Sequence, residues 1–213
     1  MPITRDDKTY VRKQYYLVPF ATTEVTDDAI NNTRGKYKRK FNCTMIEEND
    51  GWLNRLESVE NYATLLIDGH SSEEASDEIS AEAGNTILRI GVDDLALSID
   101  SFWKLDKGHQ KIRMLACYGA AGFAPKLAKA LSARGYYRIH VAGYLGPVGP
   151  QAYDDATGRG TNPVTLDDEL NYGKERIAWF NGQGQVVDKP EIDAQHLIEV
   201  QDSSLIESIK TWG

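Results

Sequence analysis

The chain has 213 residues, of which 41% are hydrophobic and 26% are charged, and its formal net charge at pH 7 is −8. These values predict one soluble globular domain over residues 1–213. They disfavour a general nucleic-acid binder or a membrane-surface binder, because both depend on a basic excess. No stretch approaches the roughly 18 apolar residues of a membrane span, and the first residues lack the apolar region of a secretory signal.

The cysteine content is low. Cys43 and Cys117 are the two cysteines of the chain, and no group of Cys and His residues has metal-ligand spacing. A disulfide scaffold and a metal site are therefore not expected, and a reducing, cytosol-like working environment is favoured. A protein delivered by a dedicated secretion machine, or cut out of a longer chain, would have the same composition.

The N-terminal part of the chain predicts a strand and then a short helix. Residues 1–12 are expected to be flexible, and the aromatic and aliphatic run at 15–18 predicts a first strand. Thr26-Asp27-Asp28 has the composition of a helix cap, and the helix is expected to end near Asn32.

A second strand is predicted from Lys38 to Ile46, where apolar and polar residues alternate. Cys43 falls inside this half-buried strand and is expected to be an inert thiol. A basic cluster overlaps its start: Arg34, Lys36, Lys38, Arg39 and Lys40. A solvated strand edge is the favoured interpretation of these charges, and a site for a polyanion is the alternative.

The middle of the chain continues the alternation of helices and strands. Apolar residues near helical spacing predict a helix over 52–62, and the buried strand after it stops at His70. Residues 71–85 are rich in Glu, Asp and Ser and are expected to form a solvated loop or an exposed helical turn. A short, hairpin-like strand at 86–90 precedes an amphipathic helix that buries Leu95, Ile99 and Phe102 and ends at Gly108.

A second buried strand, residues 111–117, ends at Cys117. Small residues follow it, and then a helix that begins near Phe123 and has Gly135 at its C-terminal cap. Residues 138–143 predict a further central strand. Repeated β-α-β units imply an α/β fold, namely a three-layer αβα sandwich around a mostly parallel sheet.

The C-terminal part predicts a long loop, a hairpin and a helix. Residues 146–170 are rich in Gly, Pro and Asp and are expected to form the loop. Two short strands joined across Asn181-Gly182-Gln183-Gly184 predict a hairpin over 174–190. A last helix is expected from Leu197 to Trp212.

A Cys/His dyad is the leading hypothesis for the chemistry. His70 and Cys117 both follow apolar strands, and a parallel sheet presents such residues together at its carboxyl edge. Cys117 would be the nucleophile, activated by a helix N-terminus and by His70, which would accept the thiol proton and later protonate the leaving amine. The backbone N–H groups of Cys117 and of Ser71 or Ser72 are candidate donors to the oxyanion. This chemistry requires no metal, no cofactor and no third residue.

These segments resemble the caspase-fold cysteine peptidases. The shared pattern is an apolar strand ending in Gly-His, then an apolar strand ending in Cys before a Gly-containing loop, with Cys117 47 positions after His70. Within that fold the chain is most similar to the self-processing protease domains of bacterial RTX toxins and large clostridial toxins. The helix at 91–96, the phenylalanine-led helix after Cys117 and the hairpin at 176–188 carry this similarity, which covers residues 64–190.

The resemblance implies a bacterial protein, secreted or delivered into the cytosol of a host or target cell. It would process a toxin in which it is embedded, with flanking modules in cis, or act as an effector protease on another protein or peptide substrate. The resemblance to these toxin domains implies a protease that is directed at leucine and activated by inositol hexakisphosphate. The residues that could bind such a polyphosphate here are Lys36, Lys38, Arg39, Lys40, Lys174 and Arg176.

The chain departs from the family pattern at Ser71, where the family has Gly directly after the His. Glycine reaches backbone angles that other residues adopt at a cost, so this position leaves an alternative open: a caspase-fold interaction module whose peptidase activity is lost or redirected. A Rossmann-like or flavodoxin-like nucleotide binder is disfavoured, because no glycine-rich phosphate-binding motif follows a strand.

Overall fold

The computed structural model describes residues 3–5, 8–21, 23–40, 43–46, 53, 55–72, 74, 76–146, 153–154, 159–160, 177–190 and 197–200. Its elements in chain order are β1 (Ile3–Arg5), β2 (Lys8–Arg12), β3 (Gln14–Leu17), α1 (Asp28–Lys40), β4 (Thr44–Ile46), β5 (Thr64–Asp68), β6 (Glu78–Ala83), β7 (Thr86–Gly91), α2 (Val92–Leu97), the π-helical turn η2 (Ser98–Phe102), β8 (Lys111–Leu115), α3 (Phe123–Ala133), β9 (His140–Tyr144), β10 (Tyr153–Asp154), β11 (Arg159–Gly160), β12 (Ile177–Phe180), β13 (Val186–Val187) and β14 (Leu197–Val200).

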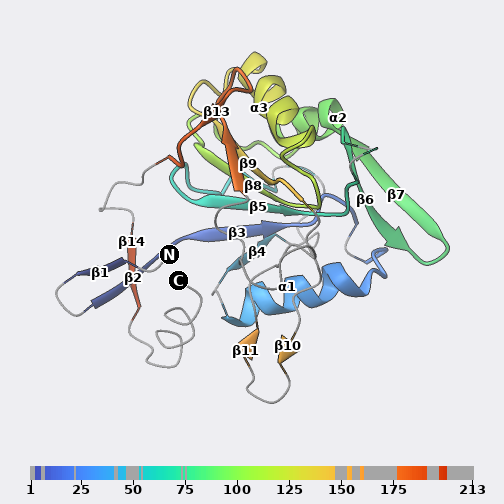
Figure 1. Ribbon diagram of the computed structural model, residues 1–213, viewed down its shortest axis with the longest axis horizontal. Helices are drawn as coiled ribbons and strands as arrows, with labels where there is room; N and C mark the ends of the chain where they lie inside the picture. The colour runs from blue at the N-terminus through green and yellow to red at the C-terminus, as the bar shows by residue number, and fades with distance from the viewer. Residues whose placement is uncertain are drawn as a thin grey trace.

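A seven-stranded sheet forms the centre of the molecule, with strand order β13-β12-β9-β8-β5-β3-β4 (Figure 1). The pairs from β4 to β9 are parallel, and β12 and β13 join antiparallel at one edge. Strand β5 is buried along its whole length. Continuous apolar runs of this kind are typical of parallel strands covered on both faces. The prediction of an α/β fold around a mostly parallel sheet is confirmed.

Helices cover both faces of the sheet (Figure 1). Helix α1 lies on one face, where the ring of Tyr37 stacks on Tyr16 of β3 with centroids 5.5 Å apart. Helices α2 and α3 lie on the other face, and α3 buries Phe123, Leu127 and Leu131. Gly135 follows α3 with φ +96°, the left-handed conformation that glycine adopts at helix ends, as the sequence predicted.

Helix α1 is longer than the sequence predicted. It runs to Lys40 rather than to about Asn32, so the first part of the predicted strand 38–46 is helical and the strand is confined to β4. Ile30 and Tyr37, two turns apart, are both buried, and this packing extends the helix through residues of modest helix propensity. The basic cluster therefore belongs to the C-terminal half of a helix and not to a strand edge.

Residues 78–91 form a hairpin, whose first strand β6 lies where the sequence predicted a loop. Strand β6 pairs antiparallel with β7 through a turn in which Gly84 has φ +60°. Ile79 and Ala81 of β6 are buried, while Glu82 is exposed. These two apolar positions alternate with polar residues in this strand, which is a weak strand signal. The surrounding acidic and small residues are typical of solvated loops, and for this reason the sequence predicted a loop.

Three predicted helices also differ from the structure. The described residues of 52–62 form turns and no helix, although Leu56 and Val59 are buried. The helix begun by α2 continues as η2 and ends at Phe102, which is exposed, before Gly108 is reached. Leu197–Val200 is strand β14 and not a helix, and residues 201–213 lie outside the described residues.

The remaining segments contain short strands. In the 1–12 segment, β1 and β2 form a small antiparallel sheet with β14. In the 146–170 segment, β10 pairs with β11, and most other residues lie outside those described. The predicted hairpin at 174–190 is present as β12 and β13 from Ile177 onward, with its first residues outside those described.

Candidate active site

His70 and Cys117 follow adjacent strands of the central sheet. Strands β5 and β8 pair in parallel, and their last aligned residues are Asp68 and Leu115. His70 lies two positions beyond Asp68, and Cys117 two positions beyond Leu115. Because side chains alternate along a strand and parallel strands share their direction, equal offsets put both residues at the carboxyl edge of the sheet. The sequence-based expectation that their strands are neighbours agrees with this arrangement.

The ring of His70 is held by a buried carboxylate. Its Nε2 lies 2.6 Å from Oδ2 of Asp27, whose side chain is 5% exposed, while the His70 side chain is 46% exposed. The backbone of His70 is fixed as well: it forms a β-bridge with Ser80, with N–H···O distances of 2.7 and 2.8 Å in the two directions. The imidazole is therefore anchored on one side and open on another.

Asp27 has two structural partners. Its Oδ1 accepts the N–H groups of Ala29 at 3.0 Å and Ile30 at 3.1 Å, which makes it the N-cap of α1. Burial raises the pKa of Asp27 most strongly, but the hydrogen bond from Ile30 and the interactions with His70 outweigh it, so the pKa lies below its ordinary value. Asp27 is thus ionised at neutral pH.

The Asp27 contact determines which nitrogen of His70 can act as a base. An ionised carboxylate only accepts hydrogen bonds, so Nε2 of His70 donates to Asp27 and the lone pair of the neutral ring is on Nδ1. The sequence predicted a helix cap within Thr26-Asp27-Asp28 and missed the contact of Asp27 with His70. No local signal could have found it, because 43 residues separate the two.

The turn after Cys117 is packed tightly against strand β9. Tyr118 has φ +51°, a left-handed conformation that costs a non-glycine residue about 1 kcal/mol or more. Its N–H donates to Gly146 O at 3.0 Å, and the N–H of Ala120 donates to Tyr144 O at 2.8 Å. A Cβ on Gly143 would lie 2.5 Å from the backbone N of Ala120. These contacts hold Cys117 in a strained, well-supported turn, as is common at functional sites.

Ser71 and Ser72 follow His70 at the same edge of the sheet. Among the non-glycine residues that the structure describes, positive φ angles occur at Lys104 and Tyr118, and Ser71 is not one of these positions. Its backbone therefore does not need the conformation that favours glycine. The predicted role of Ser71, Ser72 and Cys117 as oxyanion donors stays a prediction.

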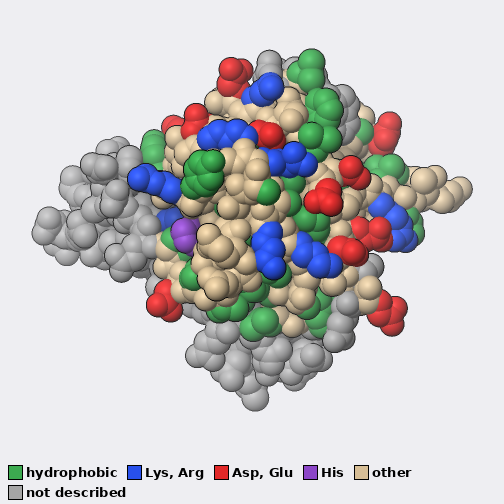
Figure 2. All heavy atoms as spheres, turned by 90° about the horizontal axis from the view of Figure 1, so that it is seen from above, with side chains coloured by type: hydrophobic (Ala, Val, Ile, Leu, Met, Phe, Trp, Pro, Cys, Tyr) green, Lys and Arg blue, Asp and Glu red, His purple; other side chains and the backbone are tan. Residues whose placement is uncertain are grey.

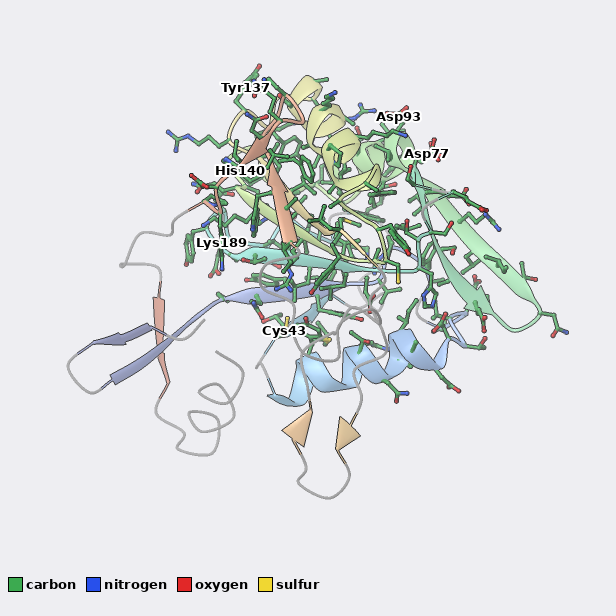
Figure 3. The ribbon with its side chains drawn as sticks, in the orientation of Figure 1. Cys43, Asp77, Asp93, Tyr137, His140 and Lys189 are labelled. Carbon is green, nitrogen blue, oxygen red and sulfur yellow. The ribbon has the colours of Figure 1, made fainter. Side chains whose placement is uncertain are left out.

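The second cysteine lies away from this edge. Cys43 is 6% exposed and lies next to β4, on the side of the sheet that α1 covers (Figure 3). Burial raises the pKa of its thiol to about 12, so the reactive thiolate is scarce at neutral pH. This environment fits the predicted inert role.

Asp68, two residues before His70, is a buried carboxyl. Its Oδ2 accepts a hydrogen bond from the hydroxyl of Tyr16, and its side chain also interacts with the N–H of Gly69. Burial raises the pKa of Asp68 to about 7, more than these hydrogen bonds lower it. A buried carboxyl with a raised pKa thus lies at the end of β5, two residues before His70.

The predicted polyphosphate site is only partly covered by the described residues. Lys36, Lys38, Arg39 and Lys40 lie on α1, and Lys38 is exposed; Lys174 and Arg176 lie outside the described residues. On the face seen from above in Figure 2, basic and acidic side chains are interspersed. Convergence of the six residues on one ligand stays a prediction.

A separate groove of about 600 Å³ lies between α3 and the start of α2. Lys126 and Lys129 line it on one side, and Asp77, Asp93 and Asp94 on the other, with Lys126 Nζ 3.7 Å from Asp77 Oδ2. Asp77 and Asp93 are marked in Figure 3. Neither His70 nor Cys117 lines this groove.

Within the described part of the chain, no group of three or more His, Cys, Asp or Glu side chains is arranged to hold a metal ion. No helix there is long and apolar enough to cross a membrane. No protein family, curated protein or solved structure matches the chain in the comparisons with known proteins.

Proposed function

We propose that the protein is a cysteine endopeptidase in which Cys117 is the nucleophile, His70 the general base and Asp27 the group that orients His70. The observation that carries this proposal is the arrangement at the sheet edge: His70 and Cys117 follow adjacent parallel strands at equal offsets, and a buried, ionised Asp27 holds the His70 ring at 2.6 Å. A thiol and an imidazole suffice for nucleophilic acyl transfer, and a carboxylate that orients the imidazole assists it.

The reaction would proceed in two stages. Nδ1 of His70 takes the thiol proton while Cys117 Sγ bonds to the substrate carbonyl carbon, and the oxyanion is stabilised by backbone N–H groups. The C–N bond then breaks as His70 returns its proton to the leaving amine. Water attacks the thioester with His70 again as base, which releases the acid and regenerates the thiol.

The resemblance to caspase-fold peptidases supports the same function. The two reactive residues follow neighbouring central strands, β5 and β8, and the antiparallel hairpin β12–β13 lies at one edge of the sheet, in the segment that resembles the flap of toxin-processing domains. By this resemblance the substrate is a protein or peptide, the setting is toxin self-processing or the action of a bacterial effector on a host protein, and inositol hexakisphosphate is the proposed activator.

Selective alkylation tests the proposal. Native protein treated with iodoacetamide at pH 7, with and without inositol hexakisphosphate, should be labelled at Cys117 at least about 100-fold faster than at Cys43, because Cys43 is buried and protonated. Mass-spectrometric peptide mapping gives both rates in one sample. Cys117→Ala should abolish cleavage of a protein or peptide library, and His70→Ala should slow both labelling and cleavage.

The controls separate the proposal from its alternative. In 6 M guanidinium chloride both cysteines should react at similar rates, which shows that the native difference is structural. If Cys117 is labelled no faster than Cys43 in the native protein under either condition, the peptidase proposal is wrong and a non-catalytic interaction module is favoured.

A further inference from the structure

Strand β6 bonds to both members of the Asp27–His70 pair through one of its edges. Ser80 exchanges two backbone hydrogen bonds with His70, at 2.7 and 2.8 Å. Two residues along the strand, Glu82 O accepts the N–H of Thr26 at 2.9 Å, and Glu82 N–H approaches Asp27 Oδ2 at 3.5 Å. The same edge of one strand therefore touches the backbone of the proposed base and the carboxylate that orients it.

The geometry of a strand gives this edge a fixed spacing. Alternate residues present their N–H and C=O groups to the same edge, and two residues span about 6.7 Å. The backbones of His70 and of the Thr26-Asp27 segment, which are 43 residues apart in sequence, are thereby held side by side. The side chains of Asp27 and His70 then need only bridge the two-residue spacing of β6 to make their 2.6 Å contact.

The tip of the hairpin is fastened to the same segment. Gly84 N–H donates to Oγ1 of Thr26 at 2.7 Å, and this hydroxyl also lies 3.5 Å from Glu82 O. Thr26 is exposed and immediately precedes Asp27. In Figure 1 the β6–β7 hairpin extends beside the N-terminal end of α1, where Asp27 is the cap.

From these contacts we infer that β6 is the positioning element of the catalytic pair, and that Thr26 and the backbone of Glu82 hold Asp27 against His70. This inference rests on the proposed function. Thr26 and Glu82 are positioning residues, because they act on the reacting atoms only through Asp27 and His70.

A pair of proline substitutions tests this role at matched positions. Glu82 and Ile87 face each other across the hairpin. Since Glu82 N–H points away from β7 toward Asp27, this pair is a non-hydrogen-bonded one, and the N–H of Ile87 points to the opposite, outer edge. Glu82→Pro and Ile87→Pro therefore both spare the ladder between the strands. Only Glu82→Pro removes an N–H that faces Asp27, and it places ring atoms there.

The measurement is the rate of iodoacetamide alkylation of Cys117 as a function of pH, with thermal unfolding recorded for each variant. Ile87→Pro should stay within about twofold of the unsubstituted protein. In Glu82→Pro the alkylation rate of Cys117 at pH 7 should fall at least about tenfold, and the rise of this rate with pH should move to higher pH. The reason is that a mispositioned Asp27 no longer stabilises the imidazolium that accompanies the Cys117 thiolate. Equal profiles for the two variants would overturn the inference, since a merely structural role lowers the unfolding temperature without moving the pH profile.

A milder pair keeps the test decisive if Glu82→Pro does not fold. Thr26→Val removes the hydroxyl that binds Gly84, and Thr26→Ser retains it. The valine variant should slow alkylation several-fold and the serine variant should restore the rate; identical rates for both would contradict the inference. If Cys117 of the unsubstituted protein is not selectively labelled, the proposed function itself has failed, which is a separate outcome.

Discussion

At the scale of single residues, Asp27 performs two tasks with its two oxygens. Oδ1 caps α1 by accepting two backbone N–H groups, and Oδ2 accepts from Nε2 of His70. A helix cap needs only an acceptor, whereas stabilising an imidazolium needs a negative charge. The two tasks can therefore be separated by changing the charge and keeping the shape.

Asp27→Asn should leave the stability of helix α1 nearly unchanged and should strongly reduce peptide cleavage. Asparagine is as good an N-cap as aspartate, so the free energy of unfolding should change by less than about 1 kcal/mol. Peptide cleavage should fall on the order of 10²–10⁴-fold, because an amide favours the wrong tautomer of His70 and leaves the imidazolium without its counter-charge. Urea unfolding and steady-state kinetics measure the two effects.

Asp27→Ala is the comparison variant. It removes the cap as well as the charge, so it should lose a similar amount of activity and, in addition, about 1 kcal/mol of stability. Unchanged cleavage in Asp27→Asn would show that Asp27 is a helix cap only.

At the scale of elements, the turn after Cys117 depends on strand β9. Tyr144 accepts the N–H of Ala120, and the absence of a side chain at Gly143 lets the turn approach the strand. The turn after the proposed nucleophile is thus supported by a neighbouring strand, as His70 is held by contacts with β6 and with Asp27 at the start of α1. Both proposed catalytic residues follow their own strand and are held by other elements.

Gly143→Ala should displace this turn. The added Cβ would lie 2.5 Å from backbone atoms of both Ala120 and Gly119, which cannot move aside as a flexible side chain can. Overpacking of this kind costs about 1–3 kcal/mol. We expect that loss of unfolding free energy together with a reduced alkylation rate at Cys117.

Gly91→Ala provides the control for added volume. There the nearest atom to the new Cβ is 3.9 Å away, so its effect on stability should be the smaller one and Cys117 should react normally. A Gly143→Ala protein with unchanged stability and labelling would show that the turn does not need the close approach.

At the scale of the whole molecule, buried titratable groups make stability depend on pH in opposing directions. Burial raises the pKa of Asp68 to about 7 and lowers the pKa of His109 to about 4. Between about pH 4 and 7 the unfolded chain ionises Asp68 while the folded protein keeps it protonated, so stability falls as pH rises. His109 has the opposite effect between about pH 4 and 6.5, because the unfolded chain binds the extra proton.

In Asp68→Asn the pH dependence of stability that is due to His109 should become visible. With the ionisable carboxyl gone, the free energy of unfolding should rise with pH between 4 and 6.5 and exceed that of the unsubstituted protein at pH 8 by up to about 4 kcal/mol, at 1.4 kcal/mol for each unit of the pKa difference. The gain should vanish below about pH 3, where Asp68 is protonated in both states. Urea titrations at several pH values measure it, and a difference between the two proteins that does not vary with pH would contradict it.

The sequence by itself determined the features that depend on local periodicity. The apolar runs before His70 and Cys117 identified two buried strands of a parallel sheet, and the pattern from Phe123 to Gly135 identified α3 with its cap. Both could be predicted because periodicity and helix capping depend on residues that are close together in the sequence. The prediction of a helix cap within Thr26-Asp27-Asp28 was equally local, and the structure assigns the cap to Asp27.

Tertiary structure alone decided what depends on packing between distant segments. Helix α1 extends to Lys40 because Ile30 and Tyr37 pack on the sheet, and Leu197–Val200 forms a strand because β2 lies beside it. The 78–83 segment becomes β6 because β7 pairs on one of its edges and the His70 and Thr26 backbones bond to the other. The Asp27–His70 contact, on which the proposed chemistry depends, joins two segments that bond to the same edge of β6 and lie 43 positions apart in the sequence.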